Sequence, residues 1–242
     1  MTYCVGLKLN AGLVLLSDTR TNAGLDNIAC YRKMFFFENP GERVIVIMTA
    51  GSLSVTQTTL ARLEEAVEDE MADETTSILL APTMLQVASI IGDSLSRTRR
   101  EISEMSRDLS QRQASASMIV AGQREGGDMR MFLIYPEGNF IEATEDTPFL
   151  QIGEHKYGKP ILDRVITPAT SLADGQKAVL LSMDSTLRSN LSVGMPLDMA
   201  VIEKNACTVS ARRRILEGDE EFSRMSHAWS AALRNSFVEI AI

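Results

Sequence analysis

Two charged residues in the first part of the chain lie beside strongly apolar sequence. Asp18 closes a segment that begins with the apolar run 13–16, and Lys33 is followed directly by Met34 and Phe35. A buried charge is costly unless an opposite charge or hydrogen-bond donors meet it, so we expect the two side chains to pair. Such a pair is either a purely structural contact or a means of holding an ammonium ion at a reacting centre. Spacing alone leaves both interpretations open.

Other familiar catalytic patterns are weak or missing. The only histidines, His155 and His227, lie far apart in the sequence, and neither an HExxH nor a GxSxG pattern occurs. Residues 153–159 fit the spacing of a phosphate-binding loop, but the next residue, Pro160, has neither a hydroxyl for Mg²⁺ nor a backbone N–H for a phosphate. We therefore expect neither histidine-based catalysis nor nucleotide binding.

Composition and charge exclude several other classes of protein. The 242 residues carry 24 Lys and Arg against 32 Asp and Glu, a formal charge of −8, so nucleic acid and anionic membranes are unfavourable partners. The run Arg212-Arg213-Arg214 follows a predicted strand, and we interpret it as a solvated or interface segment. No apolar run approaches the roughly 18 residues that span a bilayer, and the start does not resemble a signal peptide. We expect a cytoplasmic protein.

The cysteines indicate no metal or disulfide chemistry. Cys4, Cys30 and Cys207 are three in number and include no CxxC pair. Neither a disulfide framework nor a zinc site follows from that pattern. We expect reduced thiols, and neither a metal nor a cofactor.

Hydrophobic periodicity predicts strands and helices in alternating blocks, which indicates an α+β chain with helices layered on antiparallel sheets. No linker or repeat divides the sequence, so we expect a single domain over residues 1–242. Period-two patterns and turn residues predict strands at 4–9, 13–18, 30–37, 44–48, 117–122, 129–135, 140–143, 149–152, 197–203 and 207–212. Helical spacing predicts helices at 53–71, 82–102, 157–166, 172–187 and 219–237, with Glu64 on a solvated face of the first.

Several short motifs near the start of the chain occur in a characteristic order. They are Thr2-x-x-Val5-Gly6, Gly12-Leu-Val-Leu-Leu-Ser-Asp18-Thr-Arg20, Lys33, and Thr49-Ala50-Gly51-Ser52. This layout resembles the catalytic β subunits of the proteasome and the related HslV peptidases, over nearly the whole chain. Within that group, Thr-Tyr-Cys-Val-Gly-Leu and Leu-Ser-Asp-Thr-Arg-Thr-Asn-Ala-Gly are most similar to the Anbu family, also described as ancestral β subunits. The resemblance implies the four-layer αββα sandwich of N-terminal nucleophile hydrolases.

The resemblance also implies how Thr2 would react. A hydroxyl needs a base at neutral pH, and a terminal threonine carries one in its own α-amine, whose ordinary pKa is about 7.7–8.0. We expect removal of Met1 to expose that amine. Lys33 would then stabilise the developing alkoxide, and Asp18 would keep Lys33 charged and oriented.

Further site residues follow from the same resemblance. Gly51 corresponds to the glycine whose backbone N–H meets the oxyanion, and Ser192 to a serine near the terminal amine. The chain departs from the proteasome pattern at Gly153-Glu154-His155, where proteasome subunits have Gly-Ser-Gly, and at Ser189, where they have Asp. These changes alter the surroundings of the site.

A first specificity pocket is the last feature that the resemblance implies. Thr21, Tyr31, Phe35, Thr49 and Leu53 fall where this family lines it. We therefore expect a mixed, partly aromatic pocket without a charged residue.

The resemblance implies a threonine-type peptidase that hydrolyses peptide or amide bonds and assembles into a ring or spiral of identical subunits. Two other functions stay open at this point. One is a non-catalytic scaffold or binding chamber, and the other is an amidohydrolase for small molecules. The sequence identifies no unfoldase partner.

Overall fold

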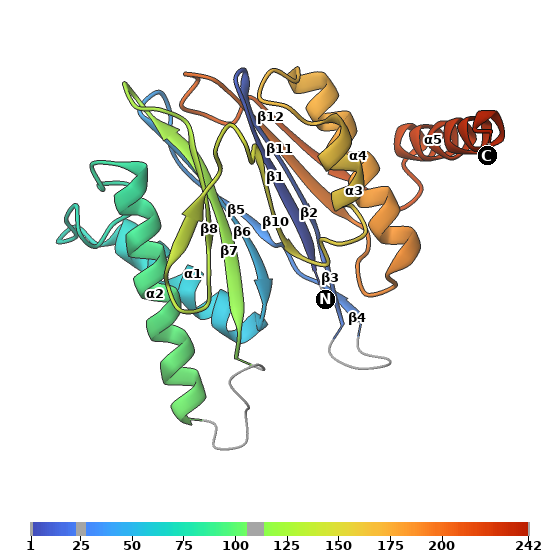
Figure 1. The fold of residues 1–242 in the computed structure, drawn as a ribbon. Coiled ribbons are helices and arrows are strands. Elements are labelled where there is room, and N and C mark those ends of the chain that lie inside the picture. Colours follow the sequence, from blue (N-terminus) through green and yellow to red (C-terminus); the bar gives the residue numbers. More distant parts are fainter. Residues whose placement is uncertain (1, 23–27, 106–113, 242) are drawn as a thin grey trace.

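Two five-stranded antiparallel sheets face one another at the centre of the computed structural model, which describes residues 2–22, 28–105 and 114–241 (Figure 1). The first sheet has the order β10-β1-β2-β11-β12. Its strands are β1 (Tyr3–Leu9), β2 (Gly12–Asp18), β10 (Phe149–Gly153), β11 (Leu197–Glu203) and β12 (Ala211–Ile215).

The second sheet has the order β5-β6-β7-β8-β9, and a separate two-stranded ribbon is formed by β3 and β4. The strands of the second sheet are β5 (Met34–Asn39), β6 (Arg43–Gly51), β7 (Ala116–Arg124), β8 (Arg130–Ile134) and β9 (Phe140–Glu142). The ribbon consists of β3 (Arg20–Asn22) and β4 (Ile28–Cys30).

Helices cover the outer faces of both sheets, which gives the expected α+β, four-layer αββα sandwich. Helices α1 (Leu53–Glu68) and α2 (Met84–Met105) pack on the second sheet, and α3 (Lys159–Val165) and α4 (Leu172–Ser189) on the first. The last helix, α5 (Glu220–Glu239), projects from the sandwich (Figure 1). No helix in the described ranges is long and apolar enough to cross a bilayer.

Strand β2 shows why the sequence forms this architecture. Leu13 and Leu15 point into the core between the sheets, whereas Val14 and Leu16 point into the core beneath α3 and α4. Because side chains alternate along a strand, a strand buried on both faces is a continuous apolar run. The run 13–16 is therefore what an inner strand of a four-layer sandwich requires.

Most predicted elements are present, but some boundaries were wrong for local reasons. The second helix begins at Met84 rather than at Pro82, because the hydroxyl of Thr83 accepts a hydrogen bond from the backbone of Gln86 and caps it. The predicted strand 207–212 lies at Ala211–Ile215, because the backbone at Cys207 has a φ of 48° and turns there.

The predicted strand 30–37 is also interrupted. β4 ends at Cys30 and β5 begins at Met34, and the backbone of Tyr31 donates to Thr19 O at 2.9 Å between them. The interruption leaves Lys33 in a link rather than in a strand.

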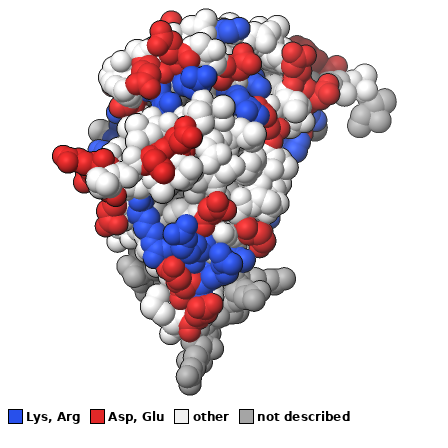
Figure 2. All heavy atoms as spheres, turned by 90° about the vertical axis from the view of Figure 1, so that its left-hand side faces the viewer, with Lys and Arg blue, Asp and Glu red and all other residues white. Residues whose placement is uncertain are grey.

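The outer face formed by α1 and α2 carries its charges unevenly. The second half of α2 contains Arg97, Arg99 and Arg100. In Figure 2, Lys and Arg side chains gather in the lower part of this face, Asp and Glu surround them, and a largely uncharged area lies above.

Tyr3 anchors the first strand to its neighbours. Its side chain is fully buried, its hydroxyl lies 2.6 Å from Ser182 Oγ on α4, and Gln151 Nε2 on β10 donates to it at 2.6 Å. Gly158 leaves room for this contact, since a Cβ there would lie 2.7 Å from the Tyr3 hydroxyl. Burial raises the pKa of Tyr3 to about 12.

The buried hydroxyl of Tyr3 should make the free energy of unfolding depend on pH in the alkaline range, and Tyr3→Phe tests this. Near pH 9 the phenol is protonated in both states, whereas between about pH 10 and 12 only the unfolded chain loses its proton. The free energy of unfolding of the wild type should therefore fall with rising pH by up to about 1.4 kcal/mol per pH unit more than that of Tyr3→Phe. Urea unfolding of both proteins across this range measures the difference, and parallel curves would contradict it.

Candidate active site

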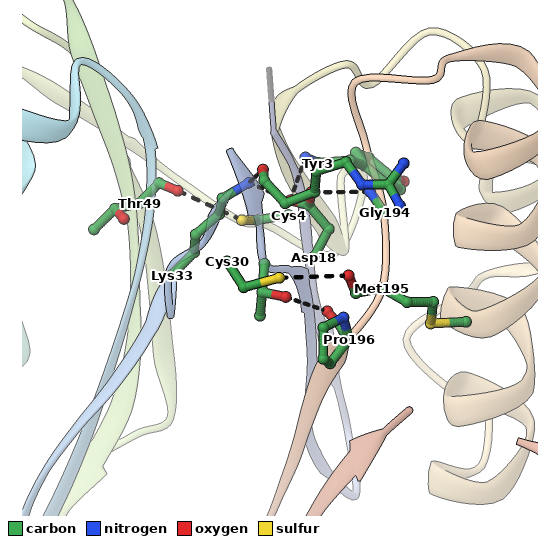
Figure 3. A network of polar contacts seen from close by, with 11 residues as sticks. Tyr3, Cys4, Asp18, Cys30, Lys33, Thr49, Gly194, Met195 and Pro196 are labelled. Atoms are coloured by element: carbon green, nitrogen blue, oxygen red, sulfur yellow. Dashed lines mark hydrogen bonds and ion pairs between the residues drawn. The ribbon is translucent and has the colours of Figure 1, made fainter. Parts of the chain in front are cut away.

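The predicted contact between Asp18 and Lys33 is present, and it is buried. Lys33 Nζ donates to Asp18 Oδ1 at 2.7 Å and to the carbonyl oxygen of Arg20 at 2.6 Å (Figure 3). The relative exposure is 0% for Asp18 and 5% for Lys33. The pair therefore lies in surroundings where charges interact more strongly than in water.

Besides the Lys33 ammonium ion, Asp18 binds two backbone N–H groups. The backbone N–H of Tyr3 donates to Oδ1 at 3.0 Å, and that of Gly194 donates to Oδ2 at 3.3 Å. Burial raises the pKa of Asp18, while the Lys33 ammonium and the two backbone N–H groups oppose that rise. One carboxylate thus joins β1, the link before β5 and the loop after α4 (Figure 3).

Sequence reasoning missed Gly194. A Cβ at this position would lie 2.2 Å from Arg20 Nε, so a larger residue here would displace the Arg20 side chain. A single glycine in a loop, flanked by Val193 and Met195, carries no recognisable pattern. Only the packing against Arg20 reveals its part in the site.

Thr2 lies directly before β1 and precedes the residue whose backbone N–H binds Asp18. It is 7% exposed, and its carbonyl oxygen accepts a hydrogen bond from the backbone of Glu154 at 2.7 Å. Gly153, whose φ is +82°, allows this approach, because a Cβ there would lie 1.9 Å from Thr2 O. The next residue, Tyr3, is bound to Asp18, so Thr2 is fixed from two sides.

The structure places Gly51 at the end of β6, before α1. Its φ is +108°, and a Cβ would lie 2.3 Å from Ser115 O on the neighbouring chain segment. The backbone geometry therefore requires glycine here. A simple strand-to-helix turn and an oxyanion site both fit this requirement.

Ser192 is positioned by its own loop. It is half-buried, and its backbone N–H donates to Asn190 Oδ1 at 2.9 Å. Among the described residues, no hydrogen bond connects Ser192 with Thr2 or Asp18, and the loop reaches Asp18 through Gly194 instead.

Four of the five predicted pocket residues line one cavity of about 380 Å³, which we call the α1 pocket. Tyr31, Phe35, Thr49 and Leu53 lie on its wall, and the Thr49 N–H donates to Lys33 O at 2.9 Å, so the cavity adjoins the ion pair. Thr21 is not in this wall; it lies on β3, opposite Ala29 of β4.

The α1 pocket is not free of charge, which corrects the sequence prediction. Arg32 and Glu64 line it together with Gln57, Leu60 and Ala61. The prediction failed because it considered only the five residues named above, whereas Arg32 and Glu64, both exposed, also border the cavity. Residues 57, 60, 61 and 64 share one face of α1 by helical spacing, and that face borders the cavity.

The positions that depart from the proteasome pattern have local partners. His155 Nδ1 lies 3.2 Å from Gly153 O, next to Thr2. Arg188 Nε donates to Asp184 at 3.1 Å and Nη2 to Ser226 Oγ at 2.7 Å, which connects α4 with α5. The arginine before Ser189 is therefore committed to helix packing.

The site offers a hydroxyl and an ammonium ion in a water-poor setting. In the described part of the chain, no three His, Cys, Asp or Glu residues are placed to hold a metal ion, and all three thiols are free. The polar side chains that the sequence analysis singled out here are those of Thr2, Lys33 and Asp18. Such a set can activate a nucleophile and stabilise a negative charge.

Comparison with known proteins gives a consistent result. The family described as Proteasome subunit matches residues 2–202. An Anbu (Gly-1) mutant structure from Hyphomicrobium sp. strain MC1 is 48% identical, with a TM-score of 0.93, and covers 100% of this chain and 99% of that one. Anbu (ancestral beta-subunit) from Yersinia bercovieri is 39% identical, with a TM-score of 0.92 and coverage of 99% and 98%. Among curated proteins, none matches.

A further relative is described as a helical assembly. This structure, the Anbu complex from Pseudomonas aeruginosa, is 41% identical, with a TM-score of 0.92, and covers 99% of this chain and 97% of that one. Identity near two fifths over almost the full length, together with the family match, establishes the relationship. The chain belongs to the proteasome subunit family and, within it, to the Anbu group.

Proposed function

We propose that this chain is an N-terminal threonine peptidase that hydrolyses peptide bonds through an acyl-enzyme on Thr2. The observation that carries the proposal is the buried Asp18–Lys33 pair, with Thr2 one residue from the backbone N–H that binds Asp18. The α1 pocket beside Lys33 supports a peptide or protein substrate, since it is large enough for one side chain. The chain would act as one domain in the cytoplasm and without a cofactor.

The reaction would begin once Met1 has been removed. Thr2 Oγ attacks the carbonyl carbon of the scissile bond, and its proton passes to the α-amine of Thr2, through a water molecule. The amine is then the acid that protonates the leaving nitrogen as the C–N bond breaks. Water hydrolyses the resulting ester in the second half, with the same amine as base.

Electrostatic interactions would lower the activation barriers of both acylation and deacylation. The Lys33 ammonium ion faces the developing charge on Thr2 Oγ, and Asp18 keeps that ammonium ion charged and in place. The Gly51 N–H would meet the oxyanion of the tetrahedral intermediate, and Ser192 would support the terminal amine. The side chain before the cleaved bond would occupy the α1 pocket.

A non-catalytic scaffold is the second candidate. It is favoured by Arg188, whose guanidinium is committed to Asp184 and Ser226, and by the altered residues Glu154 and Ser189. An amidohydrolase for small molecules would use the same nucleophile.

Self-association is the other part of the proposal. The relative from Pseudomonas aeruginosa forms a helical assembly, and this chain has exposed apolar side chains on the projecting helix α5. The relative exposure is 51% for Leu233, 80% for Phe237 and 82% for Val238. Apolar side chains that protrude in this way are typical of an interface. The largely uncharged centre of the α1 and α2 face is a second candidate surface (Figure 2).

The peptidase proposal predicts covalent labelling at Thr2. A peptidyl epoxyketone, which reacts with both the hydroxyl and the amine of a terminal threonine, should label the Met1-free chain, and peptide mapping should locate the adduct on Thr2. Thr2→Ala should not be labelled but should fold normally, because the hydrogen bond that Thr2 accepts from Glu154 uses its backbone carbonyl, which alanine keeps. Thr2→Ser should keep partial activity, since it retains both reactive groups. Labelling of Thr2→Ala to the wild-type extent would refute the proposal.

Lys33 should be required for both stability and rate. Lys33→Ala leaves Asp18 buried without its cation, which should lower the free energy of unfolding by about 3–5 kcal/mol. Lys33→Arg supplies a cation but not a compact ammonium ion, so we expect labelling of Thr2 to slow by roughly a hundredfold. Urea unfolding and the rate of labelling separate these effects. An undiminished rate in Lys33→Arg would remove Lys33 from the mechanism.

Assembly should depend on α5. In sedimentation velocity at micromolar concentration and moderate salt, the wild type should form a large species, and Phe237→Asp should shift it towards the monomer. Ile141→Asp, which places a carboxylate at another exposed apolar position, on β9, is the matched control and should leave the distribution unchanged. A monomeric wild type would count against self-association.

A further inference from the structure

A second cavity lies at the edge of the sandwich, close to the candidate active site. It has a volume of about 310 Å³ and lies between the edge strands β5 and β12, and we call it the arginine pocket. Its wall contains Arg32, Met34, Phe36, Asp198, Met199, Arg212, Arg213 and Arg214. Four arginines and a single acidic residue thus line it, in a chain whose formal charge is −8.

Three of these arginines are held in place by neighbouring groups. The Arg212 guanidinium stacks 3.8 Å from the centre of the Phe36 ring and also pairs with Glu38. Arg214 Nη1 donates to Asp198 at 3.2 Å. Each guanidinium has five N–H donors, so these contacts fix the groups without using all their donors.

Arg213 is held from the other side of β12. It pairs with Asp219 at 3.1 Å and with Glu221 at 2.7 Å. Both acidic residues belong to the start of α5, so the third guanidinium is anchored without a further carboxylate in the wall of the pocket.

Arg32 differs from the other three. Among the described residues, its side chain makes no hydrogen bond or ion pair. Burial raises the pKa of Asp198, and the charges of Arg214 and Arg32 oppose that rise. Arg32 also lines the α1 pocket, so it stands between the two cavities.

The register of the first sheet connects the arginine pocket with the catalytic pair. Leu197 on β11 lies opposite Asp18, and Asp198 lies opposite Ser17. Asp198 in the wall of the pocket is therefore one residue along β11 from the residue opposite Asp18, and its side chain lies on the other face of the sheet. Arg32 lines both cavities, and successive side chains of an extended peptide point to opposite sides. A peptide with one side chain in the α1 pocket would therefore place the neighbouring side chain on the other side of Arg32.

We propose that the arginine pocket binds an acidic side chain of the peptide, adjacent to the residue in the α1 pocket. The proposal rests on the peptidase function but concerns substrate selection alone. Arg32 would supply the unpaired charge, and Arg212 and Arg214 would add hydrogen bonds to the carboxylate. Asp198 keeps Arg214 oriented in the absence of substrate.

Peptide binding to Thr2→Ala tests this without turnover. The probes are two fluorescein-labelled hexapeptides, capped at both ends, with a central Leu and either Glu or Gln beside it. Fluorescence anisotropy should give a dissociation constant roughly tenfold lower for the Glu peptide, as one charge-assisted contact implies. Arg32→Gln in the same background should reduce this ratio to about one, whereas Arg100→Gln, on the outer face of α2, should leave it unchanged.

The outcomes separate this proposal from the peptidase function. Equal binding of both peptides by Thr2→Ala, or an undiminished ratio in Arg32→Gln, would overturn the pocket assignment even if Thr2 of the wild type is labelled. A Glu preference that depends on Arg32 would support it even if labelling fails. If Arg32→Gln instead weakens assembly in sedimentation velocity while the peptide ratio persists, the pocket receives a carboxylate of a second copy, and the proposal is wrong.

Discussion

The burial of one ammonium ion and one carboxylate constrains the whole end of the sandwich where they lie. Asp18 is inaccessible to solvent, so its charge is tolerable only if donors surround it. Those donors come from three separate parts of the chain: Lys33, the backbone of Tyr3 and the backbone of Gly194. The start of β1, the link before β5 and the loop after α4 must therefore meet at one point. That convergence fixes the residue at position 2 beside a cation.

The same constraint holds the backbone of Thr2 and Tyr3 in place, although residues near chain ends usually fray. Around Thr2 the backbone is bound to Glu154 on one side and, through Tyr3, to Asp18 on the other. The Tyr3 side chain then reaches into the core beneath α4. The backbone at Thr2, directly before the first strand, is thus held from both sides. The proposed acyl transfer at Thr2 needs such positioning.

The sequence predicts most of the fold because the physical signals are strong there. An inner strand such as 13–16 is apolar throughout, and the Asp18–Lys33 contact follows from the cost of isolated buried charge. The predicted boundaries are wrong where local backbone geometry determines the ends of a helix or strand. Because Thr83 caps α2 and the backbone turns at Cys207, α2 and β12 begin later in the sequence than predicted. Gly194 and the charged wall of the α1 pocket depend on tertiary contacts, which a residue pattern does not contain.

The most direct measurement compares two preparations of the wild-type chain, one with Met1 and one without it, each verified by intact mass. Both are treated with the same peptidyl epoxyketone and the same peptide substrate. If the amine of Thr2 is the base, only the Met1-free chain should be labelled at Thr2 and turn over substrate, because an amide nitrogen does not accept the proton. Equal labelling of both preparations at a residue other than Thr2 would contradict the terminal-nucleophile account.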